Sequence, residues 1–101
     1  MLSGAPDYTV DNEYMRLVDL AVNNAIDSGL IAVLDFFHGW AGYLVRDFDA
    51  NSVAFCKIWQ QVAERYRDYP DTLMFELINE PNKITTTSSN VLVSSINTIF
   101  I

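Results

Sequence analysis

Two neighbouring polar residues, Asn79 and Glu80, directly follow an apolar run of the sequence and could do chemistry together. Residues 72–78 have the pattern of a buried strand, so both polar groups are expected at its carboxyl end. A carboxylic acid that is partly removed from water there keeps its proton to higher pH, as a general acid requires. The adjacent amide can donate a hydrogen bond to a ligand hydroxyl and also accept one. Alternatively, Glu80 only caps the turn that follows, and position alone leaves both interpretations open.

A histidine and several aromatic residues follow an earlier apolar run, residues 30–36. His38 could bind a ligand, or its ring could be satisfied by nearby backbone groups. Trp40 and Tyr43, with Phe37, could offer flat faces to a ligand ring or could pack the loop onto the rim of the domain. Active-site groups gather at the carboxyl ends of parallel strands, so this set and the Asn-Glu pair are expected at one edge of a sheet.

Helical and strand-like segments alternate along the chain. Apolar spacing predicts helices over about 10–28, 52–68 and 89–100, and strands over about 30–36 and 72–78. This βαβ order is typical of an α/β fold with a parallel sheet. Both strands lack polar alternation, which predicts that each is covered on both faces.

Local signals refine these elements. Thr9 is a plausible N-cap of the first helix, and Gly29 offers its C-terminal stop. Residues 39–51 are predicted to form a loop because they contain Gly, Asp and Asn. In the second helix, Trp59 lies on the apolar face and is expected in the core, while Cys56 is expected to serve packing.

Composition narrows the class of partner. Half of the 101 residues are apolar, which is enough for a core, and 13 acidic against six basic side chains leave a net charge of -7. Without a Lys/Arg cluster, nucleic acid and anionic membranes are unlikely partners by charge, whereas a neutral ligand is compatible. The apolar runs are far shorter than the roughly 20 residues needed to cross a bilayer.

Other targeting and cofactor signals are absent from the sequence. Residues 1–6 have no basic residue followed by an apolar run, so no secretory signal is expected, and localisation stays open. The single cysteine excludes an intramolecular disulfide and a multi-cysteine zinc site. No metal-ligand cluster is visible, and we expect no cofactor.

Three segments together resemble glycoside hydrolase family 5, a cellulase-like family of (β/α)₈ barrels. They are Gly29-Leu-Ile-Ala-Val-Leu-Asp35, Phe55-x-x-x-Trp59-x-x-x-Ala63-Glu-Arg-Tyr-x-x-Tyr-Pro70 and Phe75-Glu-Leu-Ile-Asn-Glu-Pro81. The resemblance implies that residues 1–101 form part of one catalytic domain, roughly the third and fourth strands with their helices. It further implies that Glu80 is the acid/base, that Asn79 hydrogen-bonds the sugar hydroxyl beside the scissile bond, and that His38 binds substrate.

Hydrolysis of a glycosidic bond requires a second carboxylate, about 5 to 5.5 Å away for retention or about 6.5 to 9.5 Å for inversion. Glu76 is excluded because four residues of extended strand, at about 3.3 Å each, place it on the order of 13 Å from Glu80. Asp35 is conceivable by geometry, although an Asp at the end of a buried strand is more often a structural hydrogen-bond acceptor. The family resemblance implies a second Glu near the seventh strand, which this chain does not contain.

The expected function is therefore retaining hydrolysis of β-glycosidic bonds by a longer parent enzyme. A complete barrel takes about 250 residues, so we expect the isolated chain to lack activity. The alternatives are a non-catalytic short product that binds glycans weakly, and another family of the same clan. Open sheet edges are expected to favour self-association. The identity of the glycan is left open, because its binding subsites are built largely from loops that this chain lacks.

Overall fold

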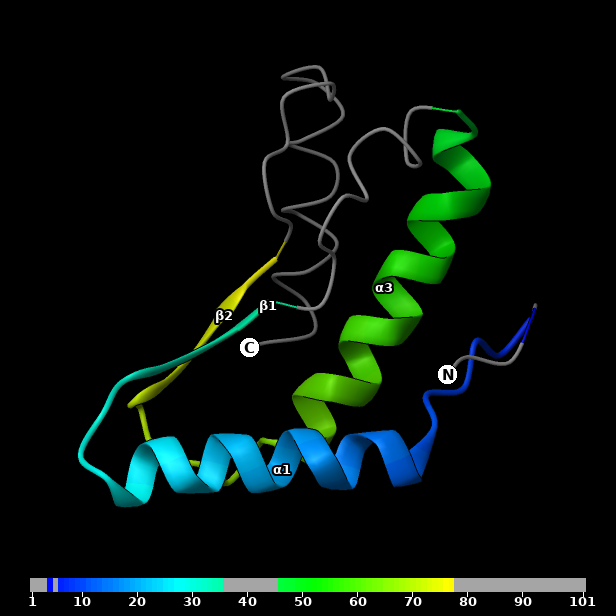
Figure 1. The fold of residues 1–101 in the computed structure, drawn as a ribbon. Coiled ribbons are helices and arrows are strands. Elements are labelled where there is room, and N and C mark those ends of the chain that lie inside the picture. Colours follow the sequence, from blue (N-terminus) through cyan, green and yellow to red (C-terminus); the bar gives the residue numbers. More distant parts are fainter. Residues whose placement is uncertain (1–3, 5, 36–45, 78–101) are drawn as a thin grey trace.

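The fold is described by a computed structural model for residues 4, 6–35 and 46–77. Within these ranges the order of elements is α1 (Asn12–Asp27), β1 (Ala32–Asp35), α3 (Phe48–Arg65) and β2 (Leu73–Glu76) (Figure 1). The predicted α/β alternation is confirmed for these four elements. The predicted third helix over 89–100 lies outside the described residues.

The N-cap of the first helix lies two positions later than predicted. Asp11, and not Thr9, is the N-cap: its carboxylate accepts hydrogen bonds from the backbone N–H groups of Glu13 (2.8 Å) and Tyr14 (3.4 Å). A carboxylate here satisfies two N–H groups that have no partner within the helix and also interacts favourably with the helix dipole. The prediction of Thr9 was wrong because both residue types are good caps and only the backbone path selects one.

The C-terminal end of α1 confirms the role of Gly29. This glycine has φ 78°, in the left-handed region, and its N–H donates to the carbonyl of Ile26 at 2.9 Å. The next N–H, from Leu30, donates to the carbonyl of Ala25 at 3.0 Å. These two bonds form a Schellman motif, in which glycine adopts the positive φ without steric cost.

The second described helix starts earlier than the sequence predicted. Helix α3 begins at Phe48, so the loop predicted over 39–51 is wrong for its last residues. The Asp47 carboxylate caps the helix by accepting from the N–H of Ala50 at 3.3 Å, and Asp49 places an acidic group in the first turn. Asp and Asn are typical of loops and also of helix N-termini, and this ambiguity explains the error.

The two strands pair in parallel, as predicted, but each has only four residues. The register pairs Ala32 with Leu73 and continues to Asp35 with Glu76. Figure 1 shows α3 lying along one side of this pair, while α1 crosses below. Helix α3 is therefore the connection that makes the parallel arrangement possible, since parallel neighbours cannot be joined by a tight turn.

The prediction that both faces of the strands are covered is wrong for the described residues. Leu73 is buried and Leu34 packs against the core, but Val33 is 60% exposed and Met74 is 53% exposed. Successive side chains of a strand point to opposite faces, and the described helices cover one of them. The other face is apolar and open in the described part of the chain.

The core lies between α3, the inner side of α1 and the helix-facing side of the strands. Trp59, Phe55, Ile58 and Val62 are the largest fully buried side chains, all from α3. The core position predicted for Trp59 is confirmed, and Cys56 packs beside the same cluster while partly buried. Repeats of three and four residues place this apolar stripe on one face of α3, where its burial provides the main stabilisation of the fold.

The N-terminal segment is attached to α3 by one side chain. The side-chain oxygen of Gln61 accepts from the N–H of Val10 at 2.9 Å, and its amide nitrogen donates to the carbonyl of Tyr8 at 2.9 Å. Tyr8 has φ 48°, which is uncommon for a residue with a side chain. Gln61 therefore holds a strained stretch of backbone directly before α1.

A charged cluster joins α1 to the C-terminal end of α3. The two carboxylate oxygens of Asp19 accept from the Arg65 guanidinium at 2.9 and 2.6 Å, and one also accepts from the Tyr66 hydroxyl at 2.7 Å. The hydrogen bond from Arg65 lowers the pKa of Asp19, whereas burial and the bond to Asp19 raise the pKa of Tyr66. A bidentate pair of this kind fixes the crossing of two helices more specifically than a single contact does.

We predict that Asp19→Asn lowers the free energy of unfolding at pH 7 by about 0.5–1 kcal/mol, a small value because the pair is partly exposed. The folded pKa of Asp19 lies below the ordinary aspartate pKa, so the ionised carboxylate stabilises the fold above that ordinary pKa and the effect disappears as pH falls through the folded pKa. Urea unfolding at pH 7 and near pH 2 should show the two proteins converging in acid. The exposed Asp68, replaced by Asn, is the control, and an equal loss in both variants would contradict the assignment.

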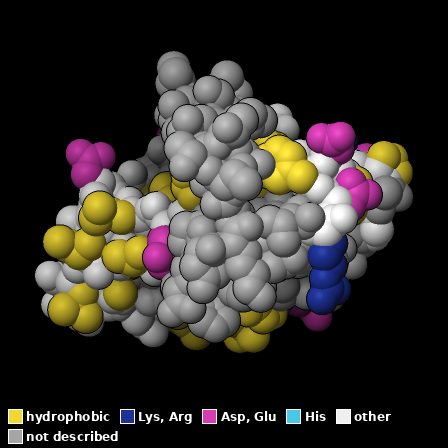
Figure 2. Space-filling view, turned by 90° about the horizontal axis from the view of Figure 1, so that it is seen from above, with side chains coloured by type: hydrophobic (Ala, Val, Ile, Leu, Met, Phe, Trp, Pro, Cys, Tyr) yellow, Lys and Arg dark blue, Asp and Glu magenta, His cyan; other side chains and the backbone are white. Residues whose placement is uncertain are grey.

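Large hydrophobic side chains are exposed on the described surface. They include Leu17 (66%), Leu20 (59%) and Ile31 (66%), in addition to the open strand face. Figure 2 shows such side chains around the edge of the view from above. Exposed apolar side chains in this number favour association.

We predict that the chain self-associates through this surface and that Leu17→Lys weakens the association. Sedimentation equilibrium over a range of concentrations measures the effect as a lower average mass. Gln60→Lys is the matched control because it adds the same charge at another exposed helical position. A monomeric wild-type chain, or an equal effect of both substitutions, would count against the prediction.

Candidate functional site at the strand ends

The carboxyl ends of the two strands lie side by side. Strand β1 ends at Asp35 and β2 ends at Glu76, and these two residues are partners in the register. The backbone therefore leaves the sheet at one edge toward both segments that carry the predicted chemistry (Figure 1). In parallel α/β folds this edge is where ligands and catalytic groups gather.

The predicted site residues themselves lie outside the described residues. His38, Trp40 and Tyr43 fall within 36–45, and Asn79 and Glu80 fall within 78–101. His38 follows the end of β1 by three positions, and Glu80 follows the end of β2 by four. Their roles stay predictions.

The register brings together two carboxylates that the sequence analysis did not connect. Asp35 is half-buried, Glu76 is exposed, and their Cα atoms are neighbours across the two strands. Asp35 lies two residues after Val33, and Glu76 lies two residues after Met74. Residues two apart in a strand share a face, so both are on the open face of the sheet. Sequence reasoning missed this pair because the offset between two strands has no local signal.

A hydrogen bond from the core reaches the exit of β2. The indole N–H of Trp59 donates to the carbonyl of Leu77 at 3.1 Å. Leu77 is the first residue after the strand, beyond the last pair of the register. The indole ring meets Phe75 edge to face, with centroids 5.9 Å apart and an interplanar angle of 87°. The backbone after β2 is therefore hydrogen-bonded at Leu77 to the buried face of α3.

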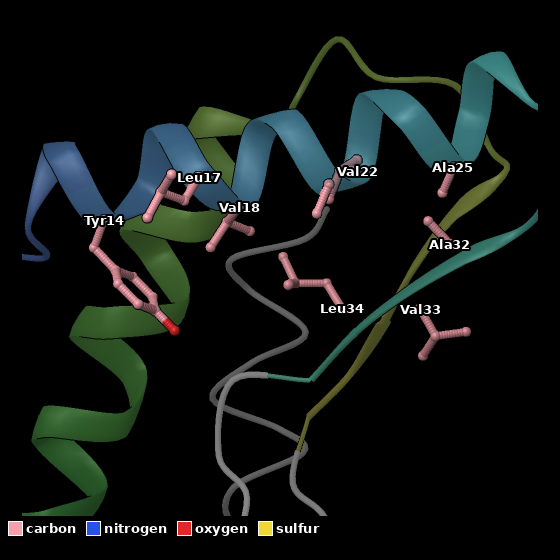
Figure 3. Close-up of a pocket in the computed structure, with 9 residues that line it drawn as sticks. Tyr14, Leu17, Val18, Val22, Ala25, Ala32, Val33 and Leu34 are labelled. Carbon is pink, nitrogen blue, oxygen red and sulfur yellow. The ribbon is translucent and has the colours of Figure 1, made fainter.

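A hollow of about 500 Å³ lies between α1 and β1, away from this edge. Figure 3 shows side chains of α1 and Leu34 of β1 pointing toward one another across it. Its lining is apolar except for the Tyr14 hydroxyl: Tyr14, Leu17, Val18, Ala21, Val22, Ala25, Ala32, Val33 and Leu34. It has no acid, base or nucleophile suited to glycosidic cleavage and does not serve as the candidate site.

The described part of the chain has neither a metal-ligand group nor a membrane-spanning helix. In residues 4, 6–35 and 46–77, no three His, Cys, Asp or Glu side chains are grouped so that they could hold a metal ion. No helix in the same ranges combines the length and hydrophobicity needed to cross a bilayer.

Curated relatives of this chain are cellulases and endoglucanases. The chain is 40% identical over 79 residues to endoglucanase A of Ruminococcus albus, a match that covers 76% of this chain and 22% of that protein. It is 33% identical over 82 residues to the cellulase/esterase CelE of Acetivibrio thermocellus, covering 79% of this chain and 10% of that protein. This chain therefore spans less than a quarter of these relatives.

Solved structures give the same result for the fold. Endoglucanase Cel5A of Thermotoga maritima in complex with cellobiose has a TM-score of 0.88 at 31% identity, covering 98% of this chain and 32% of that one. A tri-modular endo-β-1,4-glucanase of Bacillus licheniformis with cellotetraose has a TM-score of 0.88 at 25% identity, covering 97% and 20%. The described strands and helices match part of these barrel structures.

The family assignment follows from these likenesses and from a direct match to a family model. The model for cellulase, glycosyl hydrolase family 5, matches residues 1–100. Together with the parallel strand pair and the relatives, this match shows that the chain belongs to glycosyl hydrolase family 5.

Proposed function

We propose that this chain contributes the acid/base half of a retaining active site that hydrolyses β-glycosidic bonds in a longer enzyme. Residues 1–101 would form roughly the third and fourth strands of an eight-stranded barrel, with a third helix over about 89–100. The observation that carries the proposal is the register of β1 and β2, whose ends lie side by side and direct both predicted segments from one sheet edge. Family membership supports the choice of chemistry.

In this proposal Glu80 protonates the leaving oxygen of the substrate and then removes a proton from water in the second step. Asn79 hydrogen-bonds the sugar hydroxyl beside the scissile bond, and contacts of this kind strengthen in the transition state. His38 binds substrate, and Trp40 and Tyr43 stack on sugar rings. The mechanism uses two carboxylic acids and requires neither a metal nor an organic cofactor.

The nucleophile would come from another part of the enzyme. Asp35 and Glu76 are register partners across the sheet, and neither is proposed as the nucleophile. The second Glu is proposed to lie outside this chain because the family resemblance implies a nucleophile near the seventh strand.

We propose a neutral β-linked glycan as the substrate. Structures of relatives contain cellobiose, cellotetraose or mannotriose, so sugars of this class fit related sites. The net charge of -7 would oppose binding of an acidic polysaccharide and leaves neutral sugars unaffected.

The second candidate is a non-catalytic product that binds glycans weakly. This chain covers between 8% and 22% of the curated relatives, so likeness to them does not by itself give it their activity. Another family of the same clan is no longer a candidate, because the match to the family 5 model spans nearly the whole chain.

We predict that the purified chain does not hydrolyse soluble β-glucan or aryl β-glucosides, because one carboxylate of the pair is missing. Reducing-sugar release and chromogenic assays measure this. Titration with cello-oligosaccharides distinguishes the two candidates, since heat of binding without turnover favours the non-catalytic product. Robust turnover that Glu80→Gln abolishes would refute the prediction of inactivity.

The role of Glu80 is tested in a chimera in which this chain replaces the matching segment of Thermotoga maritima Cel5A. We predict that Glu80→Gln lowers kcat on β-glucan by about 10²- to 10⁴-fold, the range typical of general acid–base catalysis. The loss should be smaller for cleavage of an aryl glycoside whose leaving group needs little protonation. Glu76→Gln is the matched control and should retain activity, and an equal loss in both variants would argue against the assignment.

A further inference from the structure

The hydrogen bond from Trp59 to Leu77 has a fixed direction, which packing of the indole ring alone would not require. Trp59 is completely buried, and an indole has one N–H donor and no acceptor, so its hydrogen bond has a fixed direction. The acceptor is the carbonyl of Leu77 at 3.1 Å, beyond the last register pair of β2. A Phe at this position would fill most of the same space without directing this carbonyl.

The donor is held rigidly by its surroundings. The ring packs edge to face with Phe75, and Phe55, Ile58 and Val62 of the same helix are fully buried beside it in the core. Side chains in close-packed interiors occupy single rotamers, so the N–H has little freedom to follow a moving acceptor. The carbonyl of Leu77 must instead orient toward the indole.

We propose that Trp59 is a positioning residue that sets the direction in which the backbone leaves β2 toward Asn79 and Glu80. The carbonyl of Leu77 lies in one plane with the amide of the next residue, so fixing its direction restricts the backbone that follows. Glu80 is three residues beyond this anchor. The catalytic consequence rests on the proposed function of Glu80, whereas the positioning itself does not.

The exit of β2 needs such an anchor because the strand is short. Strand β2 has four residues, and the described ladder to β1 ends at Glu76. Beyond this point the described ladder no longer orients the backbone. A general acid requires placement within hydrogen-bond reach of the leaving oxygen, and a displacement of about 1 Å can cost about 10²-fold in rate.

The test uses the full 101-residue chain and two changes that remove the donor. In Trp59→Phe the indole is lost, and in a second variant 3-benzothienylalanine replaces Trp59, so that sulfur substitutes for the N–H while the shape is kept. Val62→Ala is the control because Val62 is equally buried in α3 and its side chain cannot donate a hydrogen bond. Nuclear magnetic resonance reports the backbone signals of residues 77–80 and the titration of the Glu80 carboxyl.

We expect both donor-free variants to shift the backbone signals of residues 77–80. We also expect them to move the titration midpoint of Glu80 by about half a pH unit, which is about a threefold change in its protonation equilibrium. Val62→Ala should lower stability and leave these signals in place. Unchanged signals in the benzothienyl variant, or equal shifts in Val62→Ala, would overturn the proposal. If the signals shift as expected but Glu80→Gln retains activity in the chimera, the positioning stands and the function proposed for Glu80 fails.

Discussion

The burial of one face of α3 against two short strands is the interaction on which the rest of the structure depends. A pair of four-residue parallel strands is too small to be stable alone, since isolated two-stranded units are marginal even with tight turns. The fully buried side chains of α3, with Trp59 at 0% exposure, provide the apolar contact that holds the strands in register. The same indole donates a hydrogen bond to the carbonyl of Leu77. The core is therefore bonded directly to the backbone that leaves β2 toward the proposed acid/base.

The polar contacts have a different role, which is to set the geometry of the segments around that core. Gln61 attaches the backbone before α1, and the Asp19–Arg65 pair fixes how α1 crosses the end of α3. These groups are only partly buried, so each contributes little net stability compared with the core. One sheet face and the side of α1 are open, and those apolar surfaces are consistent with a chain that spans only part of its relatives.

Membership of glycosyl hydrolase family 5 and the arrangement of the strand ends address different questions. The family match establishes ancestry over residues 1–100, whereas the register establishes that two distant segments start from neighbouring positions. A retaining glycosidase needs two carboxylates at a defined separation, and the register makes Asp35 and Glu76 neighbours without assigning either a catalytic role. Glu80 is therefore proposed, from the family resemblance, to work with a carboxylate outside this chain.

The sequence by itself determined those properties that depend on neighbours along the chain. Apolar periodicity located the four described elements, and the left-handed turn at Gly29 and the burial of Trp59 were predictable from spacing and residue type. Only the tertiary structure decided that Asp11 caps α1, that Val33 faces an open surface, and that the indole N–H meets Leu77. The cap is local, but the choice between Thr9 and Asp11 depends on the backbone path. The open surface at Val33 and the indole bond depend on where remote groups lie after packing, and periodicity does not specify which distant donor will reach which acceptor.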